Sequence, residues 1–493
     1  MTSADTDTYQ PDPRRWRALA VTLTAGFMTL LDVSIVNVAL PSIQHGLGAS
    51  VAVAQWVVSG YALAFGLVLV AGGRLGDSLG RRRMFLIALT AFIATSAIAG
   101  ASVNETMLVG ARLLQGIAAG MLTPQNTGLI QDLFRGAERG RAFGMFGATV
   151  GISTAVGPVL GGLIIAAFGA ETGWRWVFYV NVPIGIVALV LAARLLPQAP
   201  RRRQSLRSQL DFPGIVLLGL TVFGIMLPLV QAEQGGLARL WWLFPIAVAC
   251  GAAFVWWERR MVDRGGAPLV DLRLFTATPG YPAGATIGSV YFCGFAGMWL
   301  VFALFFQQGL GYSPLASGLL VTPFALGSAV SAAVGGRLVA HWGRRLTVTG
   351  LVLVAVGLAL VALLVPLVPS SAIGYAVAGP LLLAGIGGGM VIAPNTTLTL
   401  DRVPTRMAGV AGGALQTGQR LGTALGVAVL ASVYEAVVHS PGVHYQAGLS
   451  AALLCALGFI LLALVLAIID AHRHPHRRLS GKARSVRGTG PLE

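Results

Sequence analysis

Residues 72–82 read GGRLGDSLGRR and residues 335–345 read GGRLVAHWGRR, so seven of eleven positions are identical at an offset of 263. A weaker echo, at the similar offset of 269, relates residues 116–127 to 385–396, where Gly-Ile, Gly-Met and Asn-Thr recur in order. One such match can arise by chance in a chain rich in glycine and arginine, but two in the same order indicate a repeat. The chain is therefore expected to contain two copies of one structural unit.

The composition places both copies in a membrane. The chain is 55% hydrophobic and 11% charged, with a mean hydropathy of +0.77, which is far outside the range of soluble domains. A helix of roughly 20 apolar residues crosses the hydrocarbon core of a bilayer. Fourteen stretches suit that length, and we expect spans near 17–40, 51–73, 84–102, 106–130, 142–168, 175–196, 212–231, 238–258, 285–309, 313–336, 346–367, 372–398, 407–434 and 446–470.

Thirty of the 34 basic residues fall in alternate gaps between these spans. Because positive charge near membrane ends stays cytoplasmic, both termini are expected in the cytosol and the number of spans is even. The net charge of +16 is scattered over these loops, and no nucleic-acid-binding fold is left to carry it. We interpret the charge as a determinant of topology and of contact with anionic lipids, and we expect no nucleic-acid partner.

Six spans, two inserted spans and six further spans give the predicted organisation. It comprises a cytosolic N-terminus (1–16), an N-terminal six-helix bundle (17–197), a linker with two extra transmembrane helices (198–280), a C-terminal six-helix bundle (281–470) and a cytosolic basic tail (471–493). No cleavable signal peptide is visible, so the first span is expected to be retained. Two similar bundles are typical of transporters built from parallel repeats.

Motifs for hydrolytic, covalent or metal chemistry do not occur in the sequence. It has no Walker A motif, no H-E-x-x-H, no G-x-S-x-G and no C-x-x-C, and its three cysteines lie inside predicted spans. Pro475 interrupts the histidines at 472–476, which favours a solvated basic tail over a metal site. We therefore expect no enzyme activity, no metal and no cofactor, so any uphill transport must be driven by an ion gradient.

Three charged residues lie well inside predicted spans, away from the span ends, and they are the candidate functional residues. Asp32 is the only acid deep in a span, where a charge costs several kcal/mol unless it is paired or protonated. Arg112 lies about 9 Å below the same surface, and Asp32 lies about 12 Å below it. We expect them to pair, and a pair that opens and closes would load and release a proton. The alternative is a protonated Asp32 hydrogen-bonded to a neighbouring helix. Arg420 lies mid-span and is expected to face the bundle interior or a water-filled cavity.

Four motifs carry a family resemblance. Residues 73–83 (GRLGDSLGRRR) follow span 2, residues 31–41 (LDVSIVNVALP) lie in span 1, residues 151–162 (GISTAVGPVLGG) lie in span 5 and residues 174–183 (WRWVFYVNVP) open span 6. With these motifs the chain resembles the major facilitator superfamily, specifically its fourteen-span drug:proton antiporter family. The resemblance implies an all-α membrane protein of two six-helix bundles plus two inserted helices. Residues 112–116 (RLLQG) also resemble the motif that this family associates with proton transfer.

The resemblance also implies a conformational latch in the loop after span 2. Asp77 would dock on the start of span 13, near Thr405 to Met407, and thereby favour the outward-facing state. Gly76 and Gly80 would allow a tight turn, and the alternative is that the loop is merely a solvated turn. The repeat copy has Ala340 in place of the acid, so only the first half keeps the latch. Its other expected members are Gly73, Arg74, Gly80 and Arg81.

The glycine-rich motif of span 5 implies a tight interface between the two halves that suppresses leak, as in exporters. Glycines permit close helix approach, and Pro158 permits a kink. The residues concerned are Gly151, Gly157, Pro158, Gly161 and Gly162. Without the resemblance, dense glycine is equally consistent with ordinary packing of membrane helices.

One acid and two bases within the membrane favour a neutral, zwitterionic or singly charged lipophilic substrate, with a cation least favoured. The weaker candidates for a substrate cavity are Gln55, Trp56, Tyr61, Tyr291, Phe295, Trp299 and Arg420. Aromatic residues at helical spacing also serve for packing, and that alternative stays open for them.

The expected function is proton-coupled export of hydrophobic drugs or secondary metabolites across the cytoplasmic membrane of a bacterium. The protein is expected to act as a monomer and to contact only its substrate, protons and lipids. One rival is uptake by proton symport, and another is a scaffold or lipid-handling membrane protein. The buried charges argue against a scaffold, which gains nothing from them.

Overall fold

The computed structural model describes residues 11–169, 171–198, 211–370, 372–440 and 445–473. Residues 1–10, residues 199–210 at the start of the predicted linker, and the predicted basic tail from residue 474 lie outside these ranges. The helices are α1 (Arg15–Leu47), α2 (Val51–Leu79), α3 (Arg81–Gly100), α4 (Glu105–Leu133), α5 (Gly136–Phe168), α6 (Gly173–Tyr179), α7 (Asn181–Leu195), α9 (Phe212–Val230), η1 (Ala232–Gln234), α10 (Gly236–Arg239), α11 (Leu243–Asp263), α12 (Arg273–Thr276), α13 (Tyr281–Leu304), η2 (Phe305–Gly309), α14 (Pro314–Trp342), α15 (Arg344–Leu364), α16 (Ile373–Leu400), η3 (Thr405–Met407), α17 (Ala408–Val438) and α18 (Tyr445–Arg473).

The predicted all-helical membrane class is confirmed. Within the described ranges, thirteen helical segments are long and apolar enough to cross a membrane, with α6 and α7 together making one of them. The remaining predicted span, 238–258, corresponds to α11, a helix of 21 residues. Glu258, Arg259 and Arg260 make the last part of α11 polar, which separates it from the thirteen more apolar segments.

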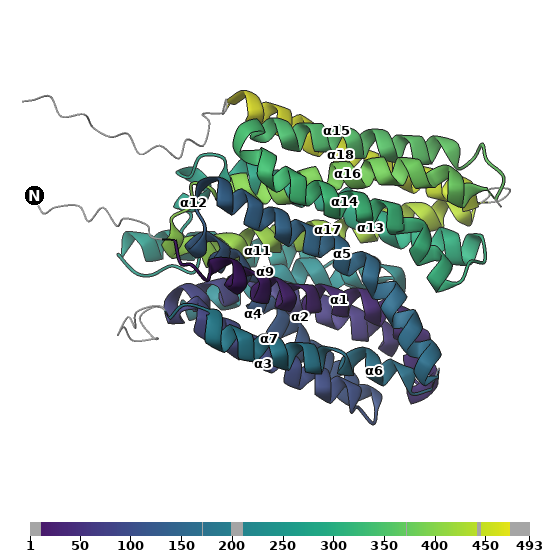
Figure 1. The fold of residues 1–493 in the computed structure, drawn as a ribbon, viewed down its shortest axis with the longest axis horizontal. Coiled ribbons are helices and arrows are strands. Elements are labelled where there is room, and N and C mark those ends of the chain that lie inside the picture. Colours follow the sequence, from purple (N-terminus) through teal and green to yellow (C-terminus); the bar gives the residue numbers. More distant parts are fainter. Residues whose placement is uncertain (1–10, 170, 199–210, 371, 441–444, 474–493) are drawn as a thin grey trace, which may run out of the picture.

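Two groups of helices lie side by side (Figure 1). Helices α1 to α7 form one group and α13 to α18 form the other, and within each group the helix axes are roughly aligned. The groups meet along two seams, because α2 packs along α17 and α5 packs along α14. Residues placed on these four helices are therefore positioned between the two halves.

Helix α9 covers the α2–α17 seam. Its Met226 packs in an apolar cluster with Leu63 of α2 and Ala428 of α17, and α11 packs in turn on α9. At one end of this inserted pair two acids are buried: Asp211 caps α9 through the Gly214 amide at 3.0 Å, and Glu258 accepts from the Val270 amide at 3.4 Å. Both acids lie near helix ends, and each accepts a hydrogen bond from a backbone amide there.

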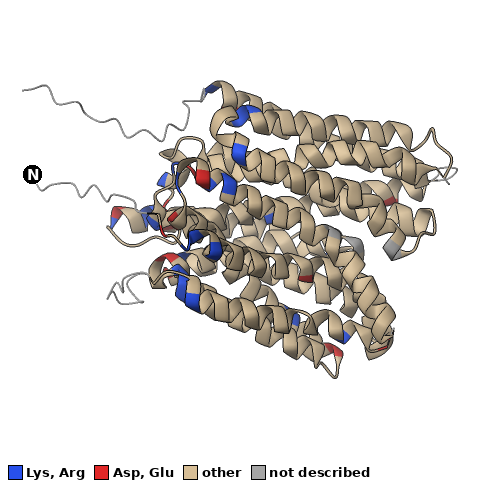
Figure 2. Cartoon of the chain, in the orientation of Figure 1, with Lys and Arg blue, Asp and Glu red and all other residues tan. Residues whose placement is uncertain are grey.

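Basic residues gather at one end of the molecule (Figure 2). Helix α1 begins and α18 ends at this end, which we call the arginine-rich end. Its residues include Arg81 and Arg82 at the start of α3, Arg139 near the start of α5, Arg337 near the end of α14 and Arg344 at the start of α15. The opposite, arginine-poor end holds few of them. The alternation of charge along the sequence is thus a physical asymmetry along the helix axes.

Candidate functional site

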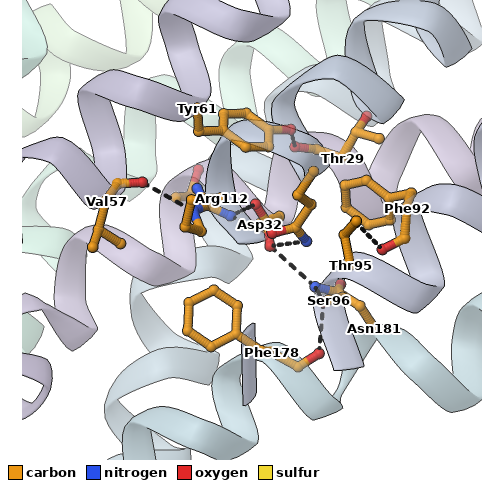
Figure 3. A network of polar contacts seen from close by, with 12 residues as sticks. Thr29, Asp32, Val57, Tyr61, Phe92, Thr95, Ser96, Arg112, Phe178 and Asn181 are labelled. Carbon is orange, nitrogen blue, oxygen red and sulfur yellow. Dashed lines mark hydrogen bonds and ion pairs between the residues drawn. The ribbon is translucent and has the colours of Figure 1, made fainter. Parts of the chain in front are cut away.

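Asp32 and Arg112 form a buried ion pair inside the first group of helices (Figure 3). Asp32 lies in α1 and Arg112 in α4, and Oδ2 of the aspartate is 2.5 Å from Nη1 of the arginine. The exposed fractions of the two residues are 0% and 1%. An acid and a base that are both removed from water neutralise each other, which makes their burial tolerable.

Helix α1 differs from the predicted first span. It continues through Pro41 to Leu47, well beyond residue 40, so Asp32 lies near the middle of the helix rather than close to its outer end. The extension is packed: Ala39 and Ile43 are fully buried in a cluster with Trp174 of α6. Burial beyond the proline therefore keeps the chain helical where the sequence suggested a stop.

Two neutral side chains complete the surroundings of the carboxylate. Gln115 Nε2 donates to Asp32 Oδ1 at 3.1 Å, and Asn181 Nδ2 donates to the same oxygen at 3.2 Å. Gln115 lies one turn after Arg112, while Asn181 opens α7 and also donates to Ser96 Oγ at 3.2 Å. Gln115 and Asn181 lie within the motifs at 112–116 and 174–183, but they were not predicted as site residues. A neutral amide inside a membrane helix is not costly enough to stand out in the sequence, as a charged side chain does.

The arginine is positioned independently of the acid. Its Nε donates to the Val57 carbonyl at 2.9 Å, and its Cζ lies 4.2 Å from the ring centroid of Tyr61. The Phe178 ring lies on another side, at 5.6 Å. Because two helices hold the guanidinium in place, Arg112 can keep its position when the bond to Asp32 opens.

The three side-chain partners of Asp32, which are Arg112, Gln115 and Asn181, all donate hydrogen bonds to its carboxylate. The carboxylate is thereby surrounded by donors from two neighbouring helices, α4 and α7.

The other proposed cavity residues do not form one site. Gln55 accepts a hydrogen bond from Gln234, and Trp56 packs on the cluster around α9. Tyr61 belongs to the Arg112 surroundings. The remaining aromatic candidates, Tyr291, Phe295 and Trp299, gather with Phe324 in the second group of helices, where Trp299 and Phe324 have ring centroids 4.8 Å apart.

Asp77 contacts the start of α17. Its Oδ1 accepts from the Gly409 amide at 3.1 Å, and its Oδ2 accepts from the Val410 amide at 3.0 Å. The contact lies a few residues beyond the expected Thr405 to Met407, because those residues form the short helix η3 and α17 begins only at Ala408. A carboxylate at a helix N-terminus satisfies unpaired amides and is stabilised by the helix dipole.

The expected tight turn at Gly76 and Gly80 is wrong in part. Helix α2 continues to Leu79, so Gly73, Arg74, Gly76 and Asp77 are helical. Only Gly80, with φ +95, makes the turn. A side chain at Gly76 would meet Gln125 of α4, so this glycine serves close packing rather than chain reversal.

Arg81 and Gly73 also contribute to the contact between Asp77 and α17. Arg81 donates to Asp77 Oδ1 at 2.9 Å, to the Gly128 carbonyl at 2.7 Å and to the Thr405 carbonyl, which belongs to the other half. A Cβ at Gly73 would lie 2.3 Å from the Gly409 carbonyl oxygen, so the two backbones touch. By contrast, Nε of Arg74 is buried without a hydrogen-bond partner.

We expect Asp77→Asn to weaken this contact. Loss of the charge at the α17 N-terminus should destabilise the state with the arginine-rich end closed by about 1–2 kcal/mol. The ratio of closed to open molecules should therefore fall by about five- to thirtyfold. Thiol labelling of a single cysteine at Gln55→Cys, in a cysteine-free background, should slow. The control is Asp263→Asn, an exposed acid near the end of α11. Equal labelling of both variants would show that Asp77 only caps a helix.

The structure also shows a second contact between the halves, which we did not predict from the sequence. Arg139 of α5 donates to the Asp401 carbonyl at 3.2 Å, and its Nη1 is 3.5 Å from Asp401 Oδ1. Beside it, a Cβ at Gly140 would lie 2.6 Å from the Gly336 carbonyl oxygen of α14. Gly336 occupies the repeat position of Gly73, so the duplicated motif brings backbones into contact at both seams.

The span 5 motif divides between two neighbours. Gly151 faces α14, where a Cβ would lie 3.1 Å from the Ala329 amide, and Pro158 lies against Gly318 of the same helix. A Cβ at Gly157 or Gly161 would instead meet α1, and Gly162 faces open space. Thus only Gly151 and Pro158 touch the other half, because one helix face cannot present all five residues to one partner.

The described residues hold no group of three or more metal-binding side chains. What the fold presents instead is a bundle of membrane-spanning helices in two halves, with an ion pair buried in one half and close contacts between the halves at one end. This is the architecture of a membrane carrier. The chain belongs to the major facilitator superfamily, whose family model matches residues 22–427.

Curated relatives cover most of the chain. A probable actinorhodin transporter of Streptomyces coelicolor is 37% identical over 87% of this chain and 74% of its own. The puromycin resistance protein pur8 of Streptomyces alboniger is 35% identical over 94% of this chain and 92% of its own. Among solved structures, the human organic anion transporter MFSD10 superposes with a TM-score of 0.66 at 19% identity, over 92% of this chain and all of that one, and this likeness concerns the fold alone.

Proposed function

We propose that this protein exports hydrophobic drugs or secondary metabolites in exchange for protons. The relatives named for antibiotics support export, since they include a transporter for actinorhodin, a resistance protein for puromycin and an export protein for cephamycin. The buried Asp32–Arg112 pair supports proton coupling, and it is the observation that carries the proposal. Such export would give the host resistance to the compound.

The arginine-rich end would face the cytosol, in line with the bias of basic residues towards that side. Both termini would then be cytosolic, in the inner membrane of a bacterium. The substrate would be small and lipophilic, and neutral, zwitterionic or singly charged. The protein would work as a monomer with lipids and protons as its other partners, and without a cofactor.

The exchange would proceed by alternating access. Contacts of Asp77 with α17 and of Arg139 with Asp401 close the arginine-rich end, and in this closed state Asp32 is paired. Opening of the pair would admit a proton from the other side, and protonated Asp32 would release Arg112. The return of the pair on the cytosolic side would expel that proton.

Transport in proteoliposomes tests this proposal. Purified protein is reconstituted, sorted by orientation, and given actinorhodin, puromycin, tetracenomycin C and a cephamycin under an imposed pH gradient. We expect at least one compound to accumulate against its gradient on the side that corresponds to the cell exterior, and an uncoupler to abolish the accumulation. Movement together with protons towards the cytosol would instead identify an uptake symporter.

A further inference from the structure

Arg420 lies deep in a spanning helix, yet its surroundings differ from those of the most buried arginines of this protein. In the described part of the chain, each arginine that is more than nine-tenths buried lies against an acid, namely Arg81, Arg112, Arg139 and Arg344. Arg420 has no such acid, and its guanidinium lies against an aromatic ring: Cζ is 4.4 Å from the centroid of Phe65. A single ring offsets only part of the cost of taking a guanidinium out of water.

The residue lies between the two halves. It comes from α17, and its Cβ is 3.9 Å from where a Cβ on Gly66 of α2 would be. Met226 of α9 packs on the same glycine, so an inserted helix screens this part of the seam. Arg420 is half-buried rather than enclosed, which leaves its donors open to an occupant.

Its depth excludes the headgroup of a lipid as that occupant. Arg420 is twelve residues into α17, about 18 Å from the start of the helix and farther from its end. Phe65, on which it stacks, lies at the middle of α2. A guanidinium at this height is beyond the reach of lipid phosphates and must be satisfied by water or by an anion that enters the protein.

The position is also tied to the proton site. Phe65 follows Tyr61 by one turn of α2, and the two rings stack with centroids 6.1 Å apart. Tyr61 in turn lies under the guanidinium of Arg112, at 4.2 Å. The ladder Arg112–Tyr61–Phe65–Arg420 therefore places Arg420 one helical turn nearer to the arginine-rich end than the Asp32 pair.

We propose that Arg420 binds a carboxylate or phenolate of the exported compound, and that the preferred substrates are lipophilic monoanions. Arginine presents a planar set of donors that suits a carboxylate. Phe65 lies against that plane, and the apolar cluster that α2, α9 and α17 form beside it suits a lipophilic body. The direction of travel rests on the proposed export function, whereas binding can be measured without transport.

Three pyrene probes separate charge from hydrophobicity: 4-(pyren-1-yl)butyrate, its methyl ester and the matching trimethylammonium compound. Binding to the purified protein is followed by energy transfer from tryptophan. We expect the butyrate to bind more tightly than the ester, and the ammonium probe to bind weakest. Arg420→Gln should lower butyrate affinity by about 10- to 100-fold and leave the ester within about twofold. Arg345→Gln, the same change at an exposed site of α15, should alter neither.

Two further variants keep the test valid if Arg420→Gln folds poorly. Arg420→Lys keeps the charge without the planar fork, and Phe65→Leu keeps the arginine without its ring. Both should lower butyrate affinity selectively, Phe65→Leu by about two- to fivefold. Equal losses for butyrate and ester would overturn the proposal, and so would a wild-type protein that binds both probes equally.

Transport of the same probes distinguishes this failure from failure of the export function. If one proton enters per substrate, butyrate export should move about twice the charge of ester export, because the anion adds one charge per cycle. Coupled export of both probes with equal affinity and no difference in charge would leave export standing and overturn the anion site. Arg420-dependent binding without any proton-driven movement would leave the anion site standing and overturn the export function.

Discussion

Replacement of Asp32 by asparagine is expected to abolish proton-driven accumulation. Each pH unit across the membrane stores about 1.4 kcal/mol per proton, so a carrier exchanging one proton for a neutral substrate supports about a tenfold concentration ratio per unit. Asp32 is the one acid near the middle of a spanning helix in the described residues. The amide side chain of asparagine, which replaces its carboxylate in the variant, cannot carry the proton. With the membrane potential clamped at zero, the ratio for Asp32→Asn should fall to about one.

The measurement is made in proteoliposomes with a compound that the wild type exports. Glu171→Gln is the matched control, since it removes an exposed acid at the arginine-poor end. Size-exclusion profiles and ligand binding verify that the Asp32→Asn protein is folded. If the variant still accumulates substrate in response to the pH gradient, protons are carried elsewhere, and the buried acids Asp211, Glu258 and Asp470 become the next candidates.

The sequence indicates the coupling site better than it indicates what surrounds it. Asp32 and Arg112 are recognisable because a charge inside a hydrophobic stretch is rare and their depths are comparable. Asn181 and Ser96 touch the same site but come from α7 and α3, and nothing in a linear sequence relates them to Asp32. Which helix faces meet depends on rotation about the helix axis, and that is fixed only by packing.

The ends of helices are where prediction fails most clearly. Gly76 resembles a turn residue, yet α2 runs past it, because the missing side chain is needed for contact with Gln125. Glu258 and Asp470 stand at the ends of predicted spans, where solvent exposure is the natural expectation. In the structure Glu258 accepts from a backbone amide and Asp470 lies against Arg344 at 2.5 Å. At these helix ends, hydrogen-bond and ion-pair partners determine whether an acid is buried, and hydropathy does not indicate those partners.

The two halves share a backbone contact but not its chemistry. Gly73 meets Gly409 at one seam and Gly336 meets Gly140 at the other. At the first seam Asp77 adds a carboxylate on two backbone amides, whereas Ala340 stands at the repeat position and Arg139 with Asp401 supplies the charge instead. Duplication thus explains the shape of both seams, and later divergence explains why one is held by an acid on a helix end and the other by an ion pair.

Removing only one member of the Asp32–Arg112 pair should be worse than removing both. Arg112→Ala leaves a buried carboxylate with no counter-charge, which costs about 3–5 kcal/mol in folding stability. In the double variant Arg112→Ala with Asp32→Asn no charge remains, and the amide at position 32 can still bond with Gln115 and Asn181. We therefore expect the double variant to regain part of the loss, with a coupling energy of about 0.5–3 kcal/mol.

Thermal unfolding of the four proteins in detergent closes this double-mutant cycle, and facilitated transport without a pH gradient is measured alongside. Arg175 supplies the control cycle, because it also bonds to backbone carbonyls, at Gly100 and Ser102, and stacks on Trp174 at 4.4 Å. Arg175→Ala combined with Asp32→Asn should give additive losses. If the Arg112 cycle is additive as well, the close contact contributes nothing beyond its separate members. Arg112 would then serve by holding Val57 and Tyr61 in place, and Asp32 would act without its help.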